Sequence, residues 1–175
     1  MIVIVGESAS GKSSVAKYLM DNCGYKRIIT YTTRAQRDYE VDGVDYYFIQ
    51  KQHFETLKKQ GFFAETASYN EWLYGSAKED YTDDTVVVLT PRGLRSLRQN
   101  GVENIYAVYL DVPRRDRLIK CLERGDNIEE AYRRNLSDVG QFDGIEDEVD
   151  LVVQNPKYLC DVKTIGDAII KEMNK

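Results

Sequence analysis

Short apolar runs alternate along the chain with segments whose apolar residues recur every three or four positions. Residues 2–5 are all β-branched, which is typical of a strand buried on both faces. Further strands are predicted at 27–30, 85–90, 105–112 and 150–153. Helices are predicted at 12–22, 53–61, 93–101, 114–125, 128–139 and 162–173. This alternation predicts an α/β fold whose parallel sheet of five strands is covered by helices on both faces.

Composition limits the partners and the compartment. The 175 residues fit a single domain, and 42% hydrophobic with 30% charged residues is typical of a soluble globular protein. The net charge is −5 and no basic block is present, so we expect no nucleic acid partner, while local arginine clusters suggest small anionic ligands. Three scattered cysteines without a C-x-x-C exclude a sulfur-rich zinc site and argue against disulfides. The apolar runs are too short to span a bilayer, and strand-like sequence begins at residue 2, where a leader would lie. We therefore expect a cytoplasmic protein with no membrane partner.

The stretch GESASGKSS, residues 6–14, has the spacing G-x-x-x-x-G-K-S between an apolar strand and a helix. Glycines let successive backbone N–H groups face inward around an anion, and the helix N-terminus adds partial positive charge. Lys12 is expected to act in catalysis at the β- and γ-phosphates of ATP, and the Ser13 hydroxyl to ligate Mg²⁺. The predicted ATP-binding residues here are Gly6, Glu7, Ser8, Ala9, Ser10, Gly11, Lys12, Ser13 and Ser14. The alternative is a glycine-rich turn capped by serine, but the strand–loop–helix context favours the phosphate loop, which alone indicates only a nucleoside triphosphate.

Two later stretches, TYTTRAQRDYEVDGVDYYF (30–48) and ETASYNEWLYGS (65–76), resemble the acceptor-binding segment of guanylate kinases. The motif residues follow in order without a gap: Thr30, Thr32-Thr33-Arg34, Arg37, the E-x-x-G-x-D-Y of 40–46, Glu65 and Tyr74-Gly75-Ser76. With the phosphate loop, the resemblance covers essentially the whole chain. It implies a single P-loop kinase domain with a core at 1–30, 82–122 and 149–175. An acceptor-binding, β-rich subdomain would be inserted at 31–81, and a small helical lid would occupy 123–148.

The resemblance implies a role for each matched residue. Arg34, Arg37, Tyr46 and Tyr74 would hold the acceptor phosphate, with Arg34 also catalytic, because guanidinium and phenol groups suit phosphate oxygens. Glu65 and Ser76 would read guanine, whose N1–H and N2–H₂ are paired donors for a carboxylate and whose O6 accepts from a hydroxyl. Adenine lacks that arrangement. Thr30 is assigned to the same acceptor site.

The stretch ERGDNIEEAYRRNL (123–136) resembles the lid of the family, which contributes arginines to the transferring phosphoryl group. Arg124 matches the first of these, whereas the best register places Asn135 at the second, just after Arg133 and Arg134. Because one residue of slippage turns a helical side chain by about 100°, only one of the pair can point correctly. We favour Arg134 as the catalytic residue and keep Arg133 as the alternative; a solvated charged helix is the other interpretation. The remaining arginines nearby, expected on a solvated helix face, are Arg114, Arg115 and Arg117.

The chain departs from the family at the D-x-D that ends the central strand. The matching segment VVVLTPRG (86–93) places Val88 and Thr90 there, and Thr90 is included in the acceptor-binding set for its hydroxyl. Asp111, at the end of a neighbouring strand, could stand in as an acid near the metal, although capping of the next helix is favoured. Asn155, in VVQN, resembles an asparagine beside the adenine of ATP, but it could equally be a turn residue before Pro156.

The resemblance therefore implies a nucleoside monophosphate kinase that transfers the γ-phosphoryl of MgATP to GMP or dGMP. The expected cofactor is Mg²⁺, the expected partners are small-molecule nucleotides, and the expected state is a monomer or homodimer. Two alternatives stay open, namely a kinase for another small phosphorylated acceptor such as a sugar phosphate, and a non-catalytic binding module. Glu65 and Ser76 argue against the former, and the intact Lys12 and Ser13 argue against the latter.

Overall fold

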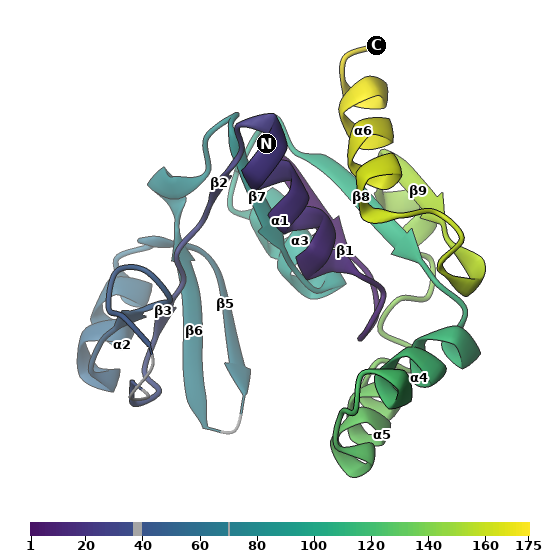
Figure 1. The fold of residues 1–175 in the computed structure, drawn as a ribbon. Coiled ribbons are helices and arrows are strands. Elements are labelled where there is room, and N and C mark those ends of the chain that lie inside the picture. Colours follow the sequence, from purple (N-terminus) through teal and green to yellow (C-terminus); the bar gives the residue numbers. More distant parts are fainter. Residues whose placement is uncertain (37–39, 70) are drawn as a thin grey trace.

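The main sheet has the predicted parallel architecture. The computed structural model describes residues 1–36, 40–69 and 71–175 (Figure 1). Five parallel strands lie in the order β2-β7-β1-β8-β9. Their bounds are β1 (Ile2–Val5), β2 (Lys26–Arg27), β7 (Thr85–Val88), β8 (Tyr106–Asp111) and β9 (Leu151–Gln154). The central strand β1 is fully buried, so the loop that follows it is fixed at the carboxyl edge of the sheet.

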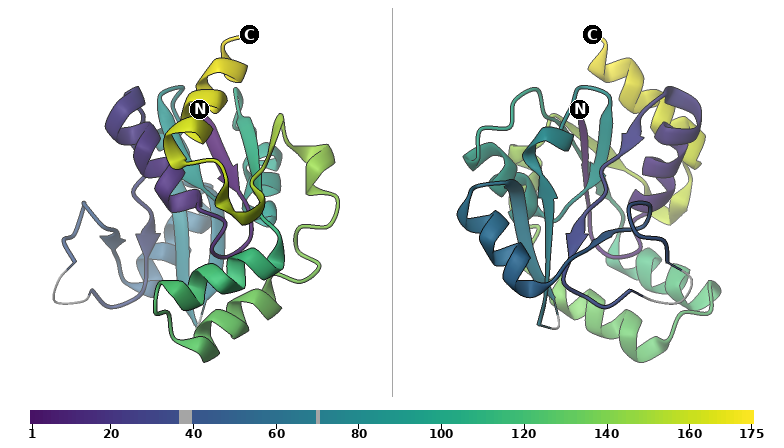
Figure 2. Two further views of the ribbon diagram at one scale, coloured as in Figure 1. Left: turned by 45° about the vertical axis from the view of Figure 1, so that its right-hand side comes forward. Right: turned by 90° about the vertical axis from the view of Figure 1, so that its left-hand side faces the viewer.

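Helices cover both faces of the main sheet because successive side chains of β1 point to opposite sides. Ile2 and Ile4 pack in one apolar cluster with residues of α1 (Lys12–Cys23) and α6 (Val162–Met173). Val3 and Val5 pack in the other cluster with α3 (Pro91–Gln99). Figure 2 shows α1 and α6 together on one side of the strands.

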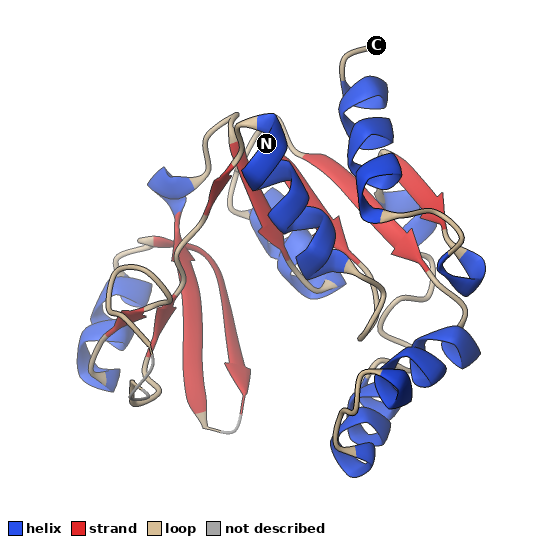
Figure 3. Cartoon of the chain, viewed as in Figure 1, coloured by secondary structure: helices blue, strands red, loops and turns tan. Residues whose placement is uncertain are grey.

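A smaller sheet stands beside the main one (Figure 3). Its strands β3 (Tyr31–Thr32), β4 (Tyr47–Phe48), β5 (Phe63–Tyr69) and β6 (Trp72–Ala77) lie in the order β4-β3-β6-β5. The buried Phe54 of α2 (Lys51–Lys59) stacks on Phe63 with ring centroids 4.5 Å apart. In the antiparallel register of β5 and β6, Glu65 lies opposite Ser76. The hairpin therefore makes cross-strand neighbours of two residues that are eleven positions apart.

A helical pair follows β8, consisting of α4 (Arg114–Glu123) and α5 (Ile128–Ser137). In Figure 1 this pair and the smaller sheet lie on opposite sides of the loop that joins β1 to α1. Short 3₁₀ turns are η1 (Lys78–Asp80), η2 (Ile145–Glu148) and η3 (Pro156–Tyr158). Within the described ranges, no helix is both long and apolar enough to cross a bilayer.

Several predicted boundaries are wrong, three of them where the chain leaves the main sheet or enters α3. The strand expected at 27–30 is reduced to Lys26–Arg27, because the chain leaves the main sheet there and joins the smaller sheet at Tyr31. The strand expected at 85–90 ends at Val88. Thr90 caps α3 instead, accepting the Gly93 N–H at 3.2 Å, so this helix starts at Pro91 and not at residue 93.

Gly166 allows α6 to lie directly against α1. A Cβ at this position would be 2.3 Å from a ring carbon of Tyr18. Helix propensity favours alanine by roughly 1 kcal/mol, yet we expect Gly166→Ala to lower the free energy of unfolding by about 1–3 kcal/mol through overpacking. Urea unfolding measures this change. In a Tyr18→Ala background the same substitution should be neutral or stabilising, and a Gly166→Ala protein as stable as the original would contradict the close approach.

Candidate active site

The loop from Gly6 to Gly11 turns the chain from β1 into the N-terminus of α1. Gly11 is the N-cap of α1 with φ 95°, and no side chain caps the helix, so its first N–H groups lack intrahelical and capping partners. Ala9 also lies in the left-handed region, at φ 67°. At Gly6 a Cβ would be 2.9 Å from the Leu110 carbonyl oxygen, so the close approach to β8 requires glycine. Inward-facing amides at a helix N-terminus bind phosphate.

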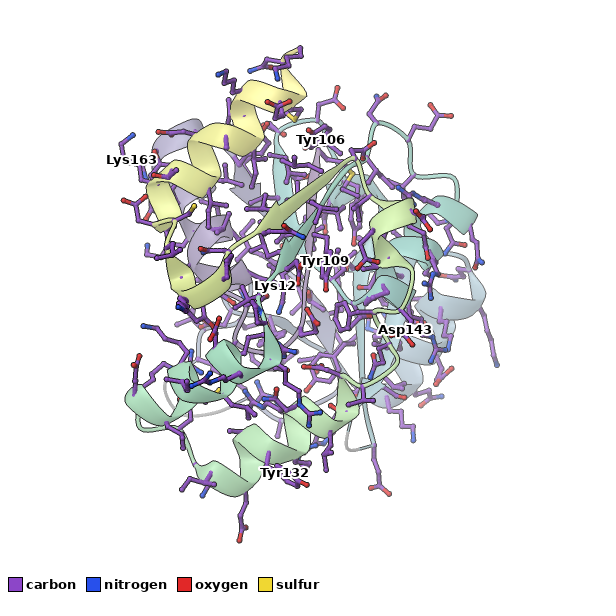
Figure 4. The ribbon with its side chains drawn as sticks, turned by 90° about the vertical axis from the view of Figure 1, so that its right-hand side faces the viewer. Lys12, Tyr106, Tyr109, Tyr132, Asp143 and Lys163 are labelled. Carbon is purple, nitrogen blue, oxygen red and sulfur yellow. The ribbon has the colours of Figure 1, made fainter. Side chains whose placement is uncertain are left out.

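Lys12 lies at the centre of this loop. Its Nζ donates to the Glu7 carbonyl oxygen at 2.6 Å and lies 3.5 Å from Ser10 Oγ. Burial lowers the pKa of Lys12 to about 8, while the carboxylates of Asp138 and Glu7 oppose that shift. Figure 4 shows Lys12 and Tyr109 in the interior, and Tyr109 donates to the Glu7 carboxylate at 3.2 Å. A bound anion would favour the charged form of this lysine.

A cavity of about 570 Å³ opens over the loop and brings most of the predicted ATP-binding residues together. Its wall comprises residues 8–15, Lys120, Arg124, Arg134, Asn155, Tyr158, Cys160, Asp161, Val162 and Ile165. A second cavity, of about 260 Å³, lies between the loop and α4–α5 and shares Arg124 and Arg134. Arg133 lines neither of them. Of the two adjacent arginines, the structure thus brings Arg134 to the phosphate loop.

Two further members of this wall are held by local contacts. Arg124 forms an ion pair with Asp126, its Nε donating at 2.8 Å, which lowers the pKa of Asp126. Asn155 is buried, and its amide exchanges two hydrogen bonds with the backbone of Cys160, at 3.0 and 2.9 Å. The two interpretations of Asn155 are therefore compatible, because it both stabilises the turn after β9 and lines the cavity.

On the smaller sheet, three of the four residues expected at the acceptor phosphate gather around one guanidinium. Arg34 is buried and contacts Glu40 at 2.5 Å, and this bond raises the pKa of Arg34, with Tyr74 contributing. The Tyr46 ring lies 5.5 Å from the Arg34 Cζ and 6.1 Å from the Tyr74 ring. Arg37, the fourth, lies outside the described residues. Glu40 belongs to the matched motif, but the sequence assigned it no role.

Glu65 and Ser76 form a buried polar pair a short way along the same sheet. The Ser76 hydroxyl donates to Glu65 Oε1 at 2.6 Å, and burial raises the pKa of Glu65 despite that bond. The Tyr81 hydroxyl lies near this pair and makes no hydrogen bond to the described residues. A buried carboxylate with one neutral donor among the described residues favours a ligand that brings further N–H groups.

A cavity of about 460 Å³ lies between the start of α1 and the residues that lead into the smaller sheet. It is lined by Ser13, Thr30, Tyr46 and Val88, together with apolar side chains and Arg27. Ser13 therefore lines both this cavity and the cavity over the loop. Glu65, Ser76 and Arg34 lie outside its lining.

One carboxylate lies near the positions where the resemblance expects D-x-D. Val88 and Thr90 line a cavity of about 200 Å³ with Lys12 and Asp138, and Asp138 Oδ2 accepts the Ser8 N–H at 2.7 Å. The favoured capping role of Asp111 is wrong, because Pro113 is the N-cap of α4 and no side chain caps that helix.

The residues at the loop fit a Mg²⁺ ion that arrives with its nucleotide. The described residues contain no cluster of three or more His, Cys, Asp or Glu that could hold a metal alone. Mg²⁺ in phosphate sites takes few protein ligands and keeps several waters, so a hydroxyl beside the phosphates is sufficient. Ser13, which lines both cavities, offers such a hydroxyl.

The expectation for Arg117 is also wrong. Arg114 and Arg115 are exposed as predicted, but Arg117 is only 4% exposed. Its Nε donates to the Val112 carbonyl oxygen at 2.9 Å, and Nη1 donates to the Ser8 carbonyl oxygen at 3.2 Å. The inward face of α4 meets the backbone of the phosphate loop there, and an arginine satisfies that polar surface where an apolar side chain could not.

Comparison with known proteins supports the geometry. A model of the guanylate kinase family matches residues 1–171. The guanylate kinase of Rickettsia bellii (strain RML369-C) is 31% identical over 183 residues, covering 100% of this chain and 95% of that protein. The guanylate kinase of Mycoplasma genitalium (strain ATCC 33530 / DSM 19775 / NCTC 10195 / G37) is 30% identical, covering 98% and 75%. The crystal structure of guanylate kinase from Anaplasma phagocytophilum matches with a TM-score of 0.66 at 22% identity, over 99% of this chain and 84% of that one. The P-loop kinase fold is thereby confirmed.

The lowered pKa of Lys12 predicts a pH dependence of stability. The unfolded side chain titrates near 10.5 and the folded one at about 8, so the unfolded chain binds more protons between these values and stability rises with pH. Lys12→Met lacks this titration. Urea unfolding from pH 7.5 to 10.5 should therefore show the original protein gaining up to about 3 kcal/mol relative to the variant. A difference that stays constant over this range would contradict the desolvation of Lys12.

Proposed function

The chain belongs to the guanylate kinase family, and we propose that its site transfers the γ-phosphoryl group of MgATP to GMP or dGMP. The observation that carries the proposal is that the chain combines two unlike groups of residues, with Ser13 lining both the cavity over the loop and the cavity that Tyr46 borders. One is a phosphate cradle with Lys12, and the other is a sheet with an arginine–tyrosine cluster and a buried Glu65–Ser76 pair. The phosphate loop would bind the donor triphosphate, and the smaller sheet would bind the guanine nucleotide that accepts the phosphoryl group.

On the donor side, the loop amides and Lys12 would hold the β- and γ-phosphates of ATP. Arg124 and Arg134, which line both cavities at the loop, would neutralise charge on the transferring group. Asn155 would lie beside the adenine. Mg²⁺ bound with ATP supplies further neutralisation of the phosphates, with the Ser13 hydroxyl as its ligand from this chain.

On the acceptor side, Arg34, Arg37, Tyr46 and Tyr74 would hold the monophosphate. The phosphate would compete with Glu40 for the Arg34 guanidinium, so binding exchanges one anionic partner for another. Glu65 would accept N1–H and N2–H₂ of guanine, and the Ser76 hydroxyl would turn from Glu65 to O6. Thr30 and Thr90 would add hydroxyl contacts at the edge of this site.

Residues 31–81 and 123–148 would act as moving parts on a core formed by 1–30, 82–122 and 149–175. The smaller sheet and the α4–α5 pair lie on opposite sides of the phosphate loop (Figure 1), and Glu65 and Arg34 lie outside the cavity that contains Ser13. Transfer requires reacting atoms about 3–3.5 Å apart. Closure of both segments would bring the acceptor to the donor and exclude water.

The activity is tested by measuring ADP release with MgATP and GMP, dGMP, AMP, CMP, UMP or dTMP, beside a control without acceptor. We expect turnover with GMP or dGMP alone, because only guanine offers paired N–H donors to Glu65. Omission of Mg²⁺ should abolish it. Turnover confined to another acceptor, or no turnover with any of them, would overturn the proposal.

Glu65→Gln should selectively weaken recognition of guanine. The amide presents a donor where the carboxylate accepts, so we expect kcat/KM for GMP to fall by a factor of about 10–100 or more. Steady-state kinetics with GMP as the varied substrate measures the loss, and KM for ATP should stay within about twofold. Glu103→Gln, at an exposed position in a loop, is the matched control. An unchanged kcat/KM for GMP would exclude Glu65 from the acceptor site.

A further inference from the structure

A buried cluster of polar side chains joins the phosphate loop to the lid. Arg117 lies at its centre and contacts Glu7 of the loop and Asn135 of α5, with Nη2 3.5 Å from Glu7 Oε1 and Nη1 3.3 Å from Asn135 Oδ1. Asp138, just after α5, lies 3.7 Å from Nη1. With the Ser8 and Val112 carbonyl oxygens, the guanidinium reaches the loop, the end of β8 and the lid at once.

The contacts of this cluster are directional. Asn135 is only 2% exposed, and its amide nitrogen donates to the Ala131 carbonyl oxygen at 3.0 Å while its oxygen accepts from Arg117. Asp138 accepts the Ser8 N–H. Buried ion pairs contribute little net stability compared with apolar packing, and their best-attested use is to fix one register. The planar guanidinium of arginine, with five N–H donors in fixed directions, fixes one arrangement of its partners better than a lysine ammonium would.

The position of the cluster links it to the reacting groups. Asn135 directly follows Arg134, and both line the cavity between the loop and α4–α5. A shift of α5 relative to the loop would therefore move Arg134 away from the phosphates. The resemblance expected a second lid arginine at position 135, where this chain has an asparagine that accepts from Arg117.

We propose that Arg117 is a positioning residue that latches α5 to the phosphate loop, so that Arg134 faces the γ-phosphoryl group and the closed site excludes water. The inference rests on the proposed kinase activity. In this arrangement α4 fixes the lid through Arg117. Asn135 of the lid contributes the acceptor of the hydrogen bond that Arg117 donates. Arg117 itself touches no nucleotide and acts through the loop and through Asn135.

An enzyme in which Arg117 no longer holds α5 against the phosphate loop should transfer phosphoryl groups to water as well as to the acceptor. We expect Arg117→Met, which keeps a long apolar stem, to lower kcat with GMP by a factor of about 10–100. It should also raise the ratio of ADP to GDP formed from near one to well above one. Because every active molecule contributes to both products, this ratio does not depend on the fraction of folded enzyme. A purely structural role would leave it unchanged.

The experiment quantifies ADP and GDP by chromatography during turnover of MgATP and GMP. Arg115→Met, an exposed arginine of the same helix, is the matched control and should keep a ratio of one. Arg117→Lys, which retains the charge but not the fork, should give an intermediate ratio. A folded Arg117→Met enzyme with a ratio of one and unchanged kcat would overturn the proposal.

A second variant covers the case in which Arg117→Met does not fold. Asn135→Ala removes the lid-side hydrogen-bond acceptor of Arg117 and leaves the arginine with its loop contacts and its 3.7 Å approach to Asp138, so the ADP to GDP ratio should again rise, by less than in Arg117→Met. A ratio of one in that variant would overturn the latch. If the original enzyme forms no GDP from GMP, the proposed activity fails, whereas an unchanged ratio in active variants contradicts only the latch.

Discussion

The N–H groups at the start of α1 set a constraint on which much of this structure depends. A helix cannot satisfy its own first amides, and Gly11 offers no side chain to cap them. Such groups can face a ligand only at an edge of the fold, and the fully buried β1 fixes that edge between β7 and β8. A parallel sheet brings the carboxyl ends of these strands together, which places Thr90 and the start of α4 around the loop. The crowding also explains why Gly6 approaches Leu110 too closely for a side chain.

In the structure, three cationic side chains of the site already have acceptors within the chain. Lys12 donates to the backbone of its own loop, Arg34 pairs with Glu40, and Arg124 pairs with Asp126. Phosphate binding, as proposed, would exchange these acceptors for phosphate oxygens, and its net free energy would be the small difference between two sets of charge-assisted bonds. Specificity for one acceptor over another would therefore depend on contacts to its uncharged base. Glu65 is the exception among these groups, because in the described part of the chain its side-chain hydrogen bond comes from the neutral Ser76 and burial raises its pKa.

The main sheet and its helices could be predicted because buried parallel strands leave short apolar runs, as residues 2–5 do. The phosphate loop was predictable for a similar reason, since its spacing is set by backbone geometry. The pairing of Glu65 with Ser76 came only from the resemblance, because period and composition do not give the register of β5 with β6. Arg117 was missed because hydropathy places every arginine at the surface. A buried one is revealed only by partners such as Glu7 and Asn135, which are distant in the sequence.

The two departures from the family pattern meet in one place. The acids expected at Val88 and Thr90 are absent, and the carboxylate that lines the same cavity is Asp138. The lid arginine expected at position 135 is absent, and Arg117 donates to the asparagine found there. Asp138 and Arg117 are themselves 3.7 Å apart. Electrostatic stabilisation of a transferring phosphoryl group depends on where charge is held and how rigidly, and not on which segment supplies it. We therefore expect a chain that lacks residues of a motif to keep its chemistry where the charges that remain at the site are fixed against the same phosphate loop.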